Sequence, residues 1–169
     1  MSLAPFDQLF AACRRSAVHL EMRDAYMLDD PMYTAWKAGD VETSGRAESP
    51  WLALMASTTG RGVGVRRARI VSEPVSDYVR FEYDITDVHS TAVGEQVRWL
   101  PRRRATDLAL PGNDFWLFDD RTVLINHFTG NGDFVDHEVT EDPVVARLCA
   151  AAFEAVWERA TPHEAYEPA

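Results

Sequence analysis

The stretch that most constrains the fold runs from residue 114 to residue 128 and reads DFWLFDDRTVLINHF. It holds two apolar runs, residues 115–118 and 122–128, separated by Asp119, Asp120 and Arg121. Two such runs joined by a few turn-forming residues predict a β-hairpin. Both runs are apolar at consecutive positions, so we expect both faces of the hairpin to be covered, as at the centre of an α/β sheet.

The ends of this hairpin are where chemistry could be placed, because its strands are too apolar to carry any. The polar residues there are Asn113, Asp114, Asp119, Asp120, Asn126 and His127. Asp119 and Asp120 could form a carboxylate pair for acid–base work. Consecutive residues in a tight turn usually diverge, however, and aspartate also favours turns for conformational reasons.

The rest of the chain predicts helices alternating with strands. From residue 50 to residue 128 we expect helix, strand, helix, strand and then the hairpin, with a third strand over 134–139. The segment after Ser76 fits a helix, although its strand propensity is also high. This order predicts an α/β fold with a mixed sheet flanked by helices. Four residues that favour the helix N-cap, three of them followed by proline, mark expected helix starts: Asp30, Ser49, Ser76 and Asp142.

Three segments at the margins of this pattern predict less regular or more exposed structure. Residues 16–23 alternate apolar and polar positions, which predicts a half-exposed strand with a solvated His19 on its polar face. Residues 38–48 are polar and contain glycine, which indicates a surface loop. The tail over 161–169 is polar and contains proline, which predicts a flexible end to a single domain spanning 1–169.

Composition and charge exclude some classes of function. The formal net charge of −10 argues against direct nucleic-acid binding by the whole surface. No apolar run approaches the ~20 residues of a membrane span. No secretory signal is visible, and Cys13 and Cys149 are predicted to be buried thiols, so we expect a cytoplasmic protein without cofactor or metal.

Two clusters of polar residues stand out beyond the hairpin. One gathers His127, Asp133, Asp136, His137 and Glu138. Because neighbouring residues of a strand point to opposite faces, at most two of residues 136–138 can converge, so a solvated acidic edge is expected rather than a metal site.

The other cluster places Arg98, Arg102, Arg103 and Arg104 around Trp99. Arginine beside an aromatic ring can grip a phosphate, stack a base or contact an acidic protein surface. The alternative is a solvated strand end that pairs with the acid-rich C-terminal third, where twelve acidic residues follow position 110.

Two resemblances add to these patterns. The runs RARIVSEPVSDYVRFEY, GEQVRWLPRR, DLALPGNDFWLFDDRTVLINHFTGNG and AFEAVWERATPHEAY resemble an uncharacterised actinobacterial family whose members are commonly encoded beside helix-turn-helix regulators. This resemblance implies a helix-turn-helix transcription regulator as a partner and implies no activity.

The middle of the chain also resembles one half of a phospholipase D-like domain, through GRGVGVRRARIV, GEQVRWLP and NDFWLFDDRTVLINHF. In that superfamily the hairpin carries His-x-Lys-x4-Asp, with a nucleophilic histidine and a phosphate-binding lysine. Aligning the motif's aspartate on Asp119 puts Gly112 and Asp114 in place of the histidine and lysine; aligning it on Asp120 puts Asn113 and Phe115 there. Neither register supplies the nucleophile and cation that phosphoryl transfer needs.

The favoured hypothesis is therefore a non-catalytic binding or regulatory protein with a phospholipase D-like half-domain layout. The analogy with that superfamily also implies a homodimer. One alternative is a hydrolase or phosphodiesterase using His127 with Asp119 or Asn113. A further alternative is a small-molecule or nucleotide sensor. The residues predicted to bind a ligand or partner are Arg98, Trp99, Arg102, Arg103, Arg104, Asp114 and Trp116.

Overall fold

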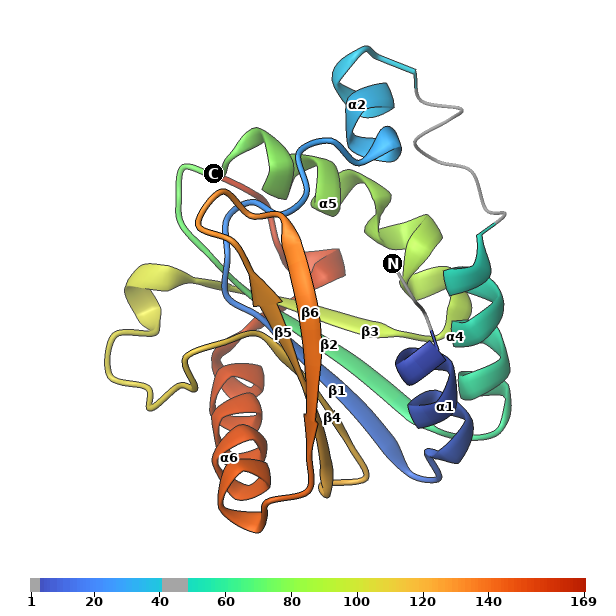
Figure 1. Cartoon of the computed structure of the whole chain (residues 1–169). Coiled ribbons are helices and arrows are strands. Elements are labelled where there is room, and N and C mark those ends of the chain that lie inside the picture. Colours follow the sequence, from blue (N-terminus) through green and yellow to red (C-terminus); the bar gives the residue numbers. More distant parts are fainter. Residues whose placement is uncertain (1–3, 41–48) are drawn as a thin grey trace.

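The computed structural model describes residues 4–40 and 49–169, which build one seven-stranded sheet with helices on both faces (Figure 1). The strands are β1 (Ser16–Glu21), β2 (Gly64–Val71), β3 (Gln96–Pro101), β4 (Phe115–Phe118), β5 (Thr122–Phe128), β6 (Phe134–Thr140) and β7 (Thr161–Pro162). Their order is β6-β5-β4-β1-β2-β3-β7. β1, β2 and β3 are parallel neighbours, and the other pairs are antiparallel. The predicted mixed sheet flanked by helices is confirmed.

The helices divide unequally between the two faces of the sheet. They are α1 (Ala4–Ala12), α2 (Pro31–Lys37), α4 (Pro50–Gly60), α5 (Asp77–His89) and α6 (Pro143–Arg159), with the short 3-10 helices η1 (Thr91–Val93), η2 (Arg102–Arg104) and η3 (His163–Ala165). α6 packs on one face, where Phe153 and Val156 meet Leu20 and Ile70 of the central strands. α1, α4 and α5 lie over the other face (Figure 1).

The four expected helix starts are all confirmed by their capping hydrogen bonds. Asp30 accepts from the N–H of Met32, and Asp142 accepts from the N–H of Val144. The hydroxyls of Ser49 and Ser76 accept from backbone N–H groups three residues further along. The segment after Ser76 is therefore a helix, because its cap and its apolar stripe outweigh its strand propensity.

Strand β1 differs from its prediction. It lies between β4 and β2, and all of its residues except Ser16 are buried. His19, expected to be solvated, is only 8% exposed. Val18 and Leu20 face α6, whereas His19 and Glu21 face the opposite side of the sheet. The alternation of apolar and polar residues therefore reflects a second buried face that carries charge, not a face in water.

The aromatic hairpin is confirmed, with Phe115 paired to Ile125 and every residue of β4 buried. Asp119 and Asp120 have φ angles of 52° and 57°. Positive φ at two successive central residues is the geometry of hairpin turns whose twist matches that of the flanking strands, and aspartate tolerates it better than most residues. The carboxylates at this turn thus have a conformational reason to be there.

Asp119 also holds the connection between α1 and β1. Its carboxylate oxygens accept from the N–H groups of Arg14, Arg15 and Ser16 at 2.9, 2.7 and 3.0 Å. Burial acts to raise the pKa of Asp119, but these backbone donors outweigh it and hold the pKa below its usual value. The carboxylate is thus engaged in holding the start of β1.

The ends of the predicted pattern also need correction. Residues 161–169, expected to be a flexible tail, contribute β7 beside β3 and bury Tyr166. The C-terminal residue Ala169 accepts a hydrogen bond from the N–H of Val75 at 2.8 Å. In the predicted loop over 38–48, residues 38–40 are exposed and residues 41–48 lie outside the described part of the chain.

Two smaller expectations concern the thiols and the membrane. Cys13 and Cys149 are free and buried, as predicted. Among the helices in residues 4–40 and 49–169, none combines the length and apolarity needed to cross a bilayer.

Candidate functional site

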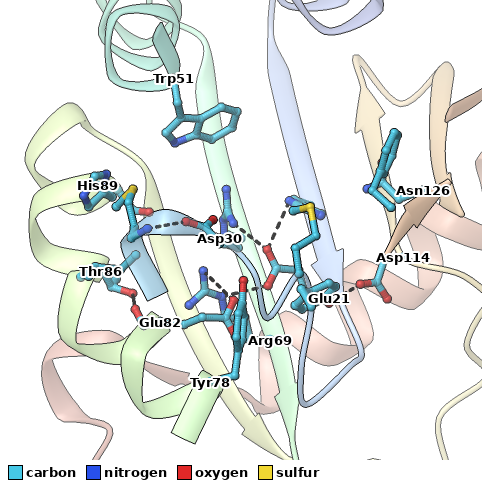
Figure 2. A pocket seen from close by; sticks show the side chains of 18 of the residues that line it. Glu21, Asp30, Trp51, Arg69, Tyr78, Glu82, Thr86, His89, Asp114 and Asn126 are labelled. Atoms are coloured by element: carbon cyan, nitrogen blue, oxygen red, sulfur yellow. Dashed lines mark hydrogen bonds and ion pairs between the residues drawn. The ribbon is translucent and has the colours of Figure 1, made fainter. Parts of the chain in front are cut away.

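A cavity of about 420 Å³ opens on the sheet face opposite α6, between the central strands and the helices α1, α4 and α5 (Figure 2). Its size falls within the roughly 300–1,000 Å³ of small-molecule sites. It combines a charged floor with aromatic walls, which is the composition expected of a ligand site rather than a packing defect.

The floor of the cavity comes from alternate residues of two parallel strands. His19 and Glu21 of β1 lie beside Arg67 and Arg69 of β2 in the strand register. Because side chains alternate across a sheet, all four project to the same face. Ala68 and Ile70, between and after the arginines, join the core under α6.

Both guanidinium groups of the floor are bound to carboxylates of this chain. Arg67 donates from Nε to Glu95 Oε1 and from Nη1 to Glu21 Oε1, each at 2.6 Å. Arg69 Nε lies 3.1 Å from Glu21 Oε2, and its Nη2 lies 3.4 Å from Glu82 Oε2. The Arg69–Glu21 contact is an ion pair without the alignment of a hydrogen bond, since both atoms lack a hydrogen-bond partner.

Aromatic rings cover the faces of the same guanidinium groups. Arg67 Cζ lies 5.5 Å from the ring centre of Trp51 and 5.6 Å from that of Trp116. Arg69 Cζ lies 4.9 Å from the ring centre of Trp99. The two arginines therefore have carboxyl groups at their edges and rings at their faces, although Nη1 of Arg69 has no hydrogen-bond partner among the described residues. The ion pairs with Glu21 and Glu95 offset most of the positive charge that an incoming anion would meet.

Glu21 and Glu82 share one negative charge. Burial raises the pKa of Glu82 well above its usual value, and the neighbouring Glu21 raises it further, against the opposing effect of Arg69. Burial also acts to raise the pKa of Glu21, but Arg69 and Arg67 outweigh it and lower that pKa to about 2. A protonated Glu82 that donates to an ionised Glu21 satisfies both directions.

Replacing Glu82 by glutamine is expected to stabilise the protein at neutral pH. Above the usual glutamate pKa, the unfolded chain releases a proton that folded Glu82 keeps, so wild-type stability falls as pH rises, by about 1.4 kcal/mol per pH unit until the folded pKa is reached. Glu82→Gln removes this loss and keeps a donor toward Glu21. Urea unfolding between pH 4 and pH 8 measures the difference, which should be near zero at pH 4 and grow with pH.

The exposed Glu158 offers the matched control, because Glu158→Gln removes a carboxylate outside the cavity. Its effect on unfolding should be small at every pH. A Glu82→Gln difference that does not vary with pH would mean that Glu82 is ionised in the folded protein.

The walls of the cavity are mainly aromatic and come from elements far apart in the sequence. α1 supplies Phe6, α4 supplies Trp51, and α5 supplies Tyr78 and Phe81. The sheet side adds Trp116 of β4 together with Phe128 and Phe134 of β5 and β6. Large rings of this kind bury apolar area and hold a fixed shape at low entropic cost.

Asp114 stands at one side of this cavity, just before β4 (Figure 2). Its Oδ1 accepts from the N–H of Met22 at 3.0 Å, and its Oδ2 accepts from the hydroxyl of Tyr26. Burial raises the pKa of Asp114 to about 6, although the bond from Tyr26 opposes the shift. At neutral pH this carboxylate is ionised and keeps acceptor capacity beyond its two bonds.

Three histidines also line the cavity. Burial lowers the pKa of His19 to about 3, and Arg67 and Arg69 lower it further against the effect of Glu21, so its ring is neutral. The His19 ring lies 4.3 Å from that of Trp116. His137 Nδ1 is 2.9 Å from Oδ1 of Asn126, and burial lowers the pKa of His137 as well. His89 completes the set from α5.

The predicted catalytic candidates are not brought together. Asn113 and Asp119 flank opposite ends of β4, and Asn113 is exposed. His127 is on the β5 face shared with Val123 and Ile125, away from the cavity side that carries Leu124 and Asn126. Its ring atoms lie 3.5 Å from Asp136 Oδ1 and 3.3 Å from Glu138 Oε2, and its side chain is 38% exposed.

The predicted binding residues divide into two groups. Asp114 and Trp116 line the cavity. Trp99, predicted to lie on a contact surface, is instead fully buried, and its Nε1 donates to Nδ1 of His163 at 3.0 Å. Trp99 faces inward because β3 is an internal strand between β2 and β7, which its short sequence run does not reveal.

The four arginines around Trp99 have mostly structural contacts. Arg98 donates to the carbonyl of Trp157, and Arg102 donates to the carbonyls of Met22 and Ile70. Arg104 donates to the carbonyl of Arg159 at 3.4 Å and is exposed. Arg103 is also exposed, which leaves η2 as the accessible part of the predicted patch.

The residues missed by sequence reasoning are the titratable ones at the cavity floor and beside it on α5: His19, Glu21, Arg67, Arg69 and Glu82. The sequence does contain a sign of these residues. RRAR at residues 66–69 interrupts an otherwise apolar strand, and HLE at residues 19–21 alternates polar and apolar positions in the same way. That signal is ambiguous by itself, since a solvated strand face has the same pattern. Within the described ranges, no group of three His, Cys, Asp or Glu side chains is placed to hold a metal ion.

Comparisons with known proteins place the chain in a family. Residues 4–168 match the family model described as "Domain of unknown function (DUF6879)", so the chain belongs to that family. A search of curated proteins finds no match.

Solved structures similar to this one share its fold at low sequence identity. The archaeal chromatin protein TrmBL2, whose structure is described as showing a novel mode of DNA binding, matches with a TM-score of 0.53 and 9% identity over 94% of this chain. This chain spans about half of that protein, 49% of its length.

Two further neighbours bear on the predicted layout. Nuc from Salmonella typhimurium, a phospholipase D family member, gives a TM-score of 0.51 and 12% identity over 94% of this chain and 88% of its own. NucT from Helicobacter pylori gives 0.52 and 11%, over 95% and 89%. The predicted phospholipase D-like fold is confirmed.

Proposed function

We propose that this member of the DUF6879 family is a non-catalytic binding protein that holds a small molecule in the cavity above β1 and β2 and thereby regulates a partner. The observation that carries the proposal is the cavity itself, with aromatic walls and a floor whose arginines are already paired. A floor bound to itself is preorganised, so a ligand can fit without the ordering cost of assembling it.

The same floor argues against phosphodiester chemistry. Phosphoryl transfer needs a nucleophile beside positive charge that is free to bind the phosphate. Asp114 occupies the lysine position of the phospholipase D-like motif in one register, and Gly112 occupies the histidine position. An anionic side chain in place of a cation repels a phosphate. DNA binding of the kind described for the chromatin protein is disfavoured by the net charge of −10.

A thermal-shift screen against amines, carboxylates, sugars and nucleotides tests ligand binding. At least one class should raise the melting temperature, and Trp51→Leu, which removes a half-buried wall residue, should abolish the rise. Phosphodiester and ester substrates should show no turnover above the buffer rate. No stabilisation by any class, or turnover that disappears in His19→Ala or His127→Ala, would reject the proposal.

For the partner, we propose a helix-turn-helix transcription regulator; the support is the family resemblance described above. The exposed η2 arginines form the proposed contact, since Arg98, Trp99 and Arg102 are engaged within the fold. The double variant Arg103→Glu with Arg104→Glu should no longer co-purify with the proposed helix-turn-helix regulator. The variant Arg121→Glu, at another exposed arginine, should co-purify as the wild type does. Equal recovery with all variants would reject this surface.

A further inference from the structure

The balance of charge around the cavity indicates which class of ligand it accepts. The lining residues include two guanidinium groups, Arg67 and Arg69, and three carboxylates, those of Glu21, Asp30 and Asp114. Burial raises the pKa of Glu82 well above its usual value and lowers the pKa of His19 to about 3, so neither side chain adds positive charge to this balance. Three carboxylates against two guanidinium groups leave a net negative charge, and Glu95, which pairs with Arg67 from outside the lining, adds another.

The unused acceptor capacity lies on the carboxylates that the arginines do not reach. Asp114 accepts one hydrogen bond at each oxygen, from Met22 and Tyr26, while a carboxylate offers about four lone-pair sites. Asp30 caps α2 through Oδ1, which accepts from the N–H of Met32 at 2.7 Å, and within residues 4–40 and 49–169 no donor is hydrogen-bonded to its Oδ2. Both side chains line the cavity, as Figure 2 shows.

The aromatic walls of the cavity also favour a cationic ligand with an apolar body. The aromatic residues that line the cavity include Trp51, Tyr78, Phe81, Trp116 and Phe128. Aromatic rings attract cations through their negative faces, and they also bury the apolar body of a ligand. The arginines already use the ring faces of Trp51 and Trp116 within the protein, which shows that these walls accommodate a cation.

We propose that the cavity binds an organic amine in its protonated form, with the ammonium group directed to one of two carboxylates, Asp114 or Asp30, which lie on opposite sides of Glu21, and an aromatic or apolar body against the ring-lined walls. This inference rests on the proposed ligand-binding function and names the class of its ligand. The overall charge of −10 also favours approach of a cation over an anion.

Three indole compounds of similar shape separate the ligand classes: tryptamine carries an ammonium, indole-3-ethanol is neutral, and indole-3-propionate is anionic. Calorimetry on the full chain at pH 7.5 should give tryptamine a dissociation constant at least about tenfold lower than that of indole-3-ethanol, with no binding of indole-3-propionate. Such a tenfold preference corresponds to ~1.4 kcal/mol.

Charge-neutralising variants locate the ammonium. Asp114→Asn keeps the shape, with its amide oxygen accepting from Met22 N–H and its NH2 group donating to the hydroxyl oxygen of Tyr26. Asp30→Asn keeps the helix cap, because asparagine caps as well as aspartate. The variant at the carboxylate that holds the ammonium should weaken tryptamine binding about tenfold, and both variants should leave indole-3-ethanol binding unchanged. Asp142→Asn changes the cap of α6, outside the cavity, and serves as the matched control with unchanged binding of both.

The outcomes also separate this inference from the proposed function. Tighter binding of indole-3-propionate or equal binding of all three compounds would overturn the amine class. So would wild-type affinity for tryptamine in both Asp114→Asn and Asp30→Asn. If none of the three binds but another class in the broader screen does, the amine class is overturned and the binding function stands. If no compound in either set binds, both are overturned.

Discussion

Replacing Arg67 by methionine is expected to lower the free energy of unfolding by about 3–5 kcal/mol, the range for breaking one side of a buried ion pair. The loss leaves Glu95 without its cation, and that side chain is completely buried. Glu21 loses its 2.6 Å hydrogen bond at the same time. Water cannot reach the carboxylate of Glu95 to replace the lost charge, so the cost is mainly one of desolvation rather than of lost packing. Urea unfolding at pH 7.5 measures it.

A surface pair provides the comparison. Arg121 is 74% exposed in its contact with Glu141, so Arg121→Met should cost only about 0–1 kcal/mol. The double variant Arg67→Met with Glu95→Gln should recover part of the loss, because it removes the buried charge left unpaired. If Arg67→Met costs no more than Arg121→Met, water enters the floor of the cavity and the network is not preorganised.

The hairpin and the helices could be predicted because their signals are local. Phe115 to Phe118 are apolar without interruption, and only a strand covered on both faces needs that pattern. Ser49 and Asp142 act on backbone groups two or three residues away. Each such signal is complete within a few residues, so the fold around it does not alter its meaning.

The cavity floor could not be predicted because its signals are not local. Glu21 and Arg67 are 46 positions apart, and Arg67 and Glu95 are 28 apart. A charged residue in an alternating strand has the same pattern whether water or a distant counter-ion lies opposite it. For this reason the alternation predicts a solvated His19, although the structure buries it. Only the parallel register of β1 and β2, which follows from the whole topology, brings these charges together.

The burial of the C-terminal segment, residues 161–169, could not be predicted either, because it also depends on distant residues. Polar residues and prolines predicted a flexible tail, yet His163 and Tyr166 are buried. Their burial depends on β3, which lies more than 60 residues earlier and presents Trp99 to them. The composition of a segment cannot reveal a binding surface that another part of the chain supplies.

Replacing Trp99 by alanine is therefore expected to cost about 3–5 kcal/mol of unfolding free energy, as for other large aromatic residues removed from a core. The Trp99 ring is fully buried, stacks on Tyr166 with 9° between the ring planes, and lies under the guanidinium of Arg69. Its indole N–H donates to His163, so the substitution leaves that buried ring without its partner. Chemical denaturation followed by circular dichroism measures the loss.

The segment in which Trp99→Ala accelerates hydrogen exchange distinguishes a tryptophan in the core from one on a contact surface. Hydrogen exchange in Trp99→Ala should accelerate most in residues 161–169, because the ring connects that segment to the sheet. Arg103→Ala, at an exposed neighbouring position, should change neither stability nor exchange. A Trp99→Ala protein of wild-type stability that has lost only partner binding would place the ring at an interface and contradict the packing described here.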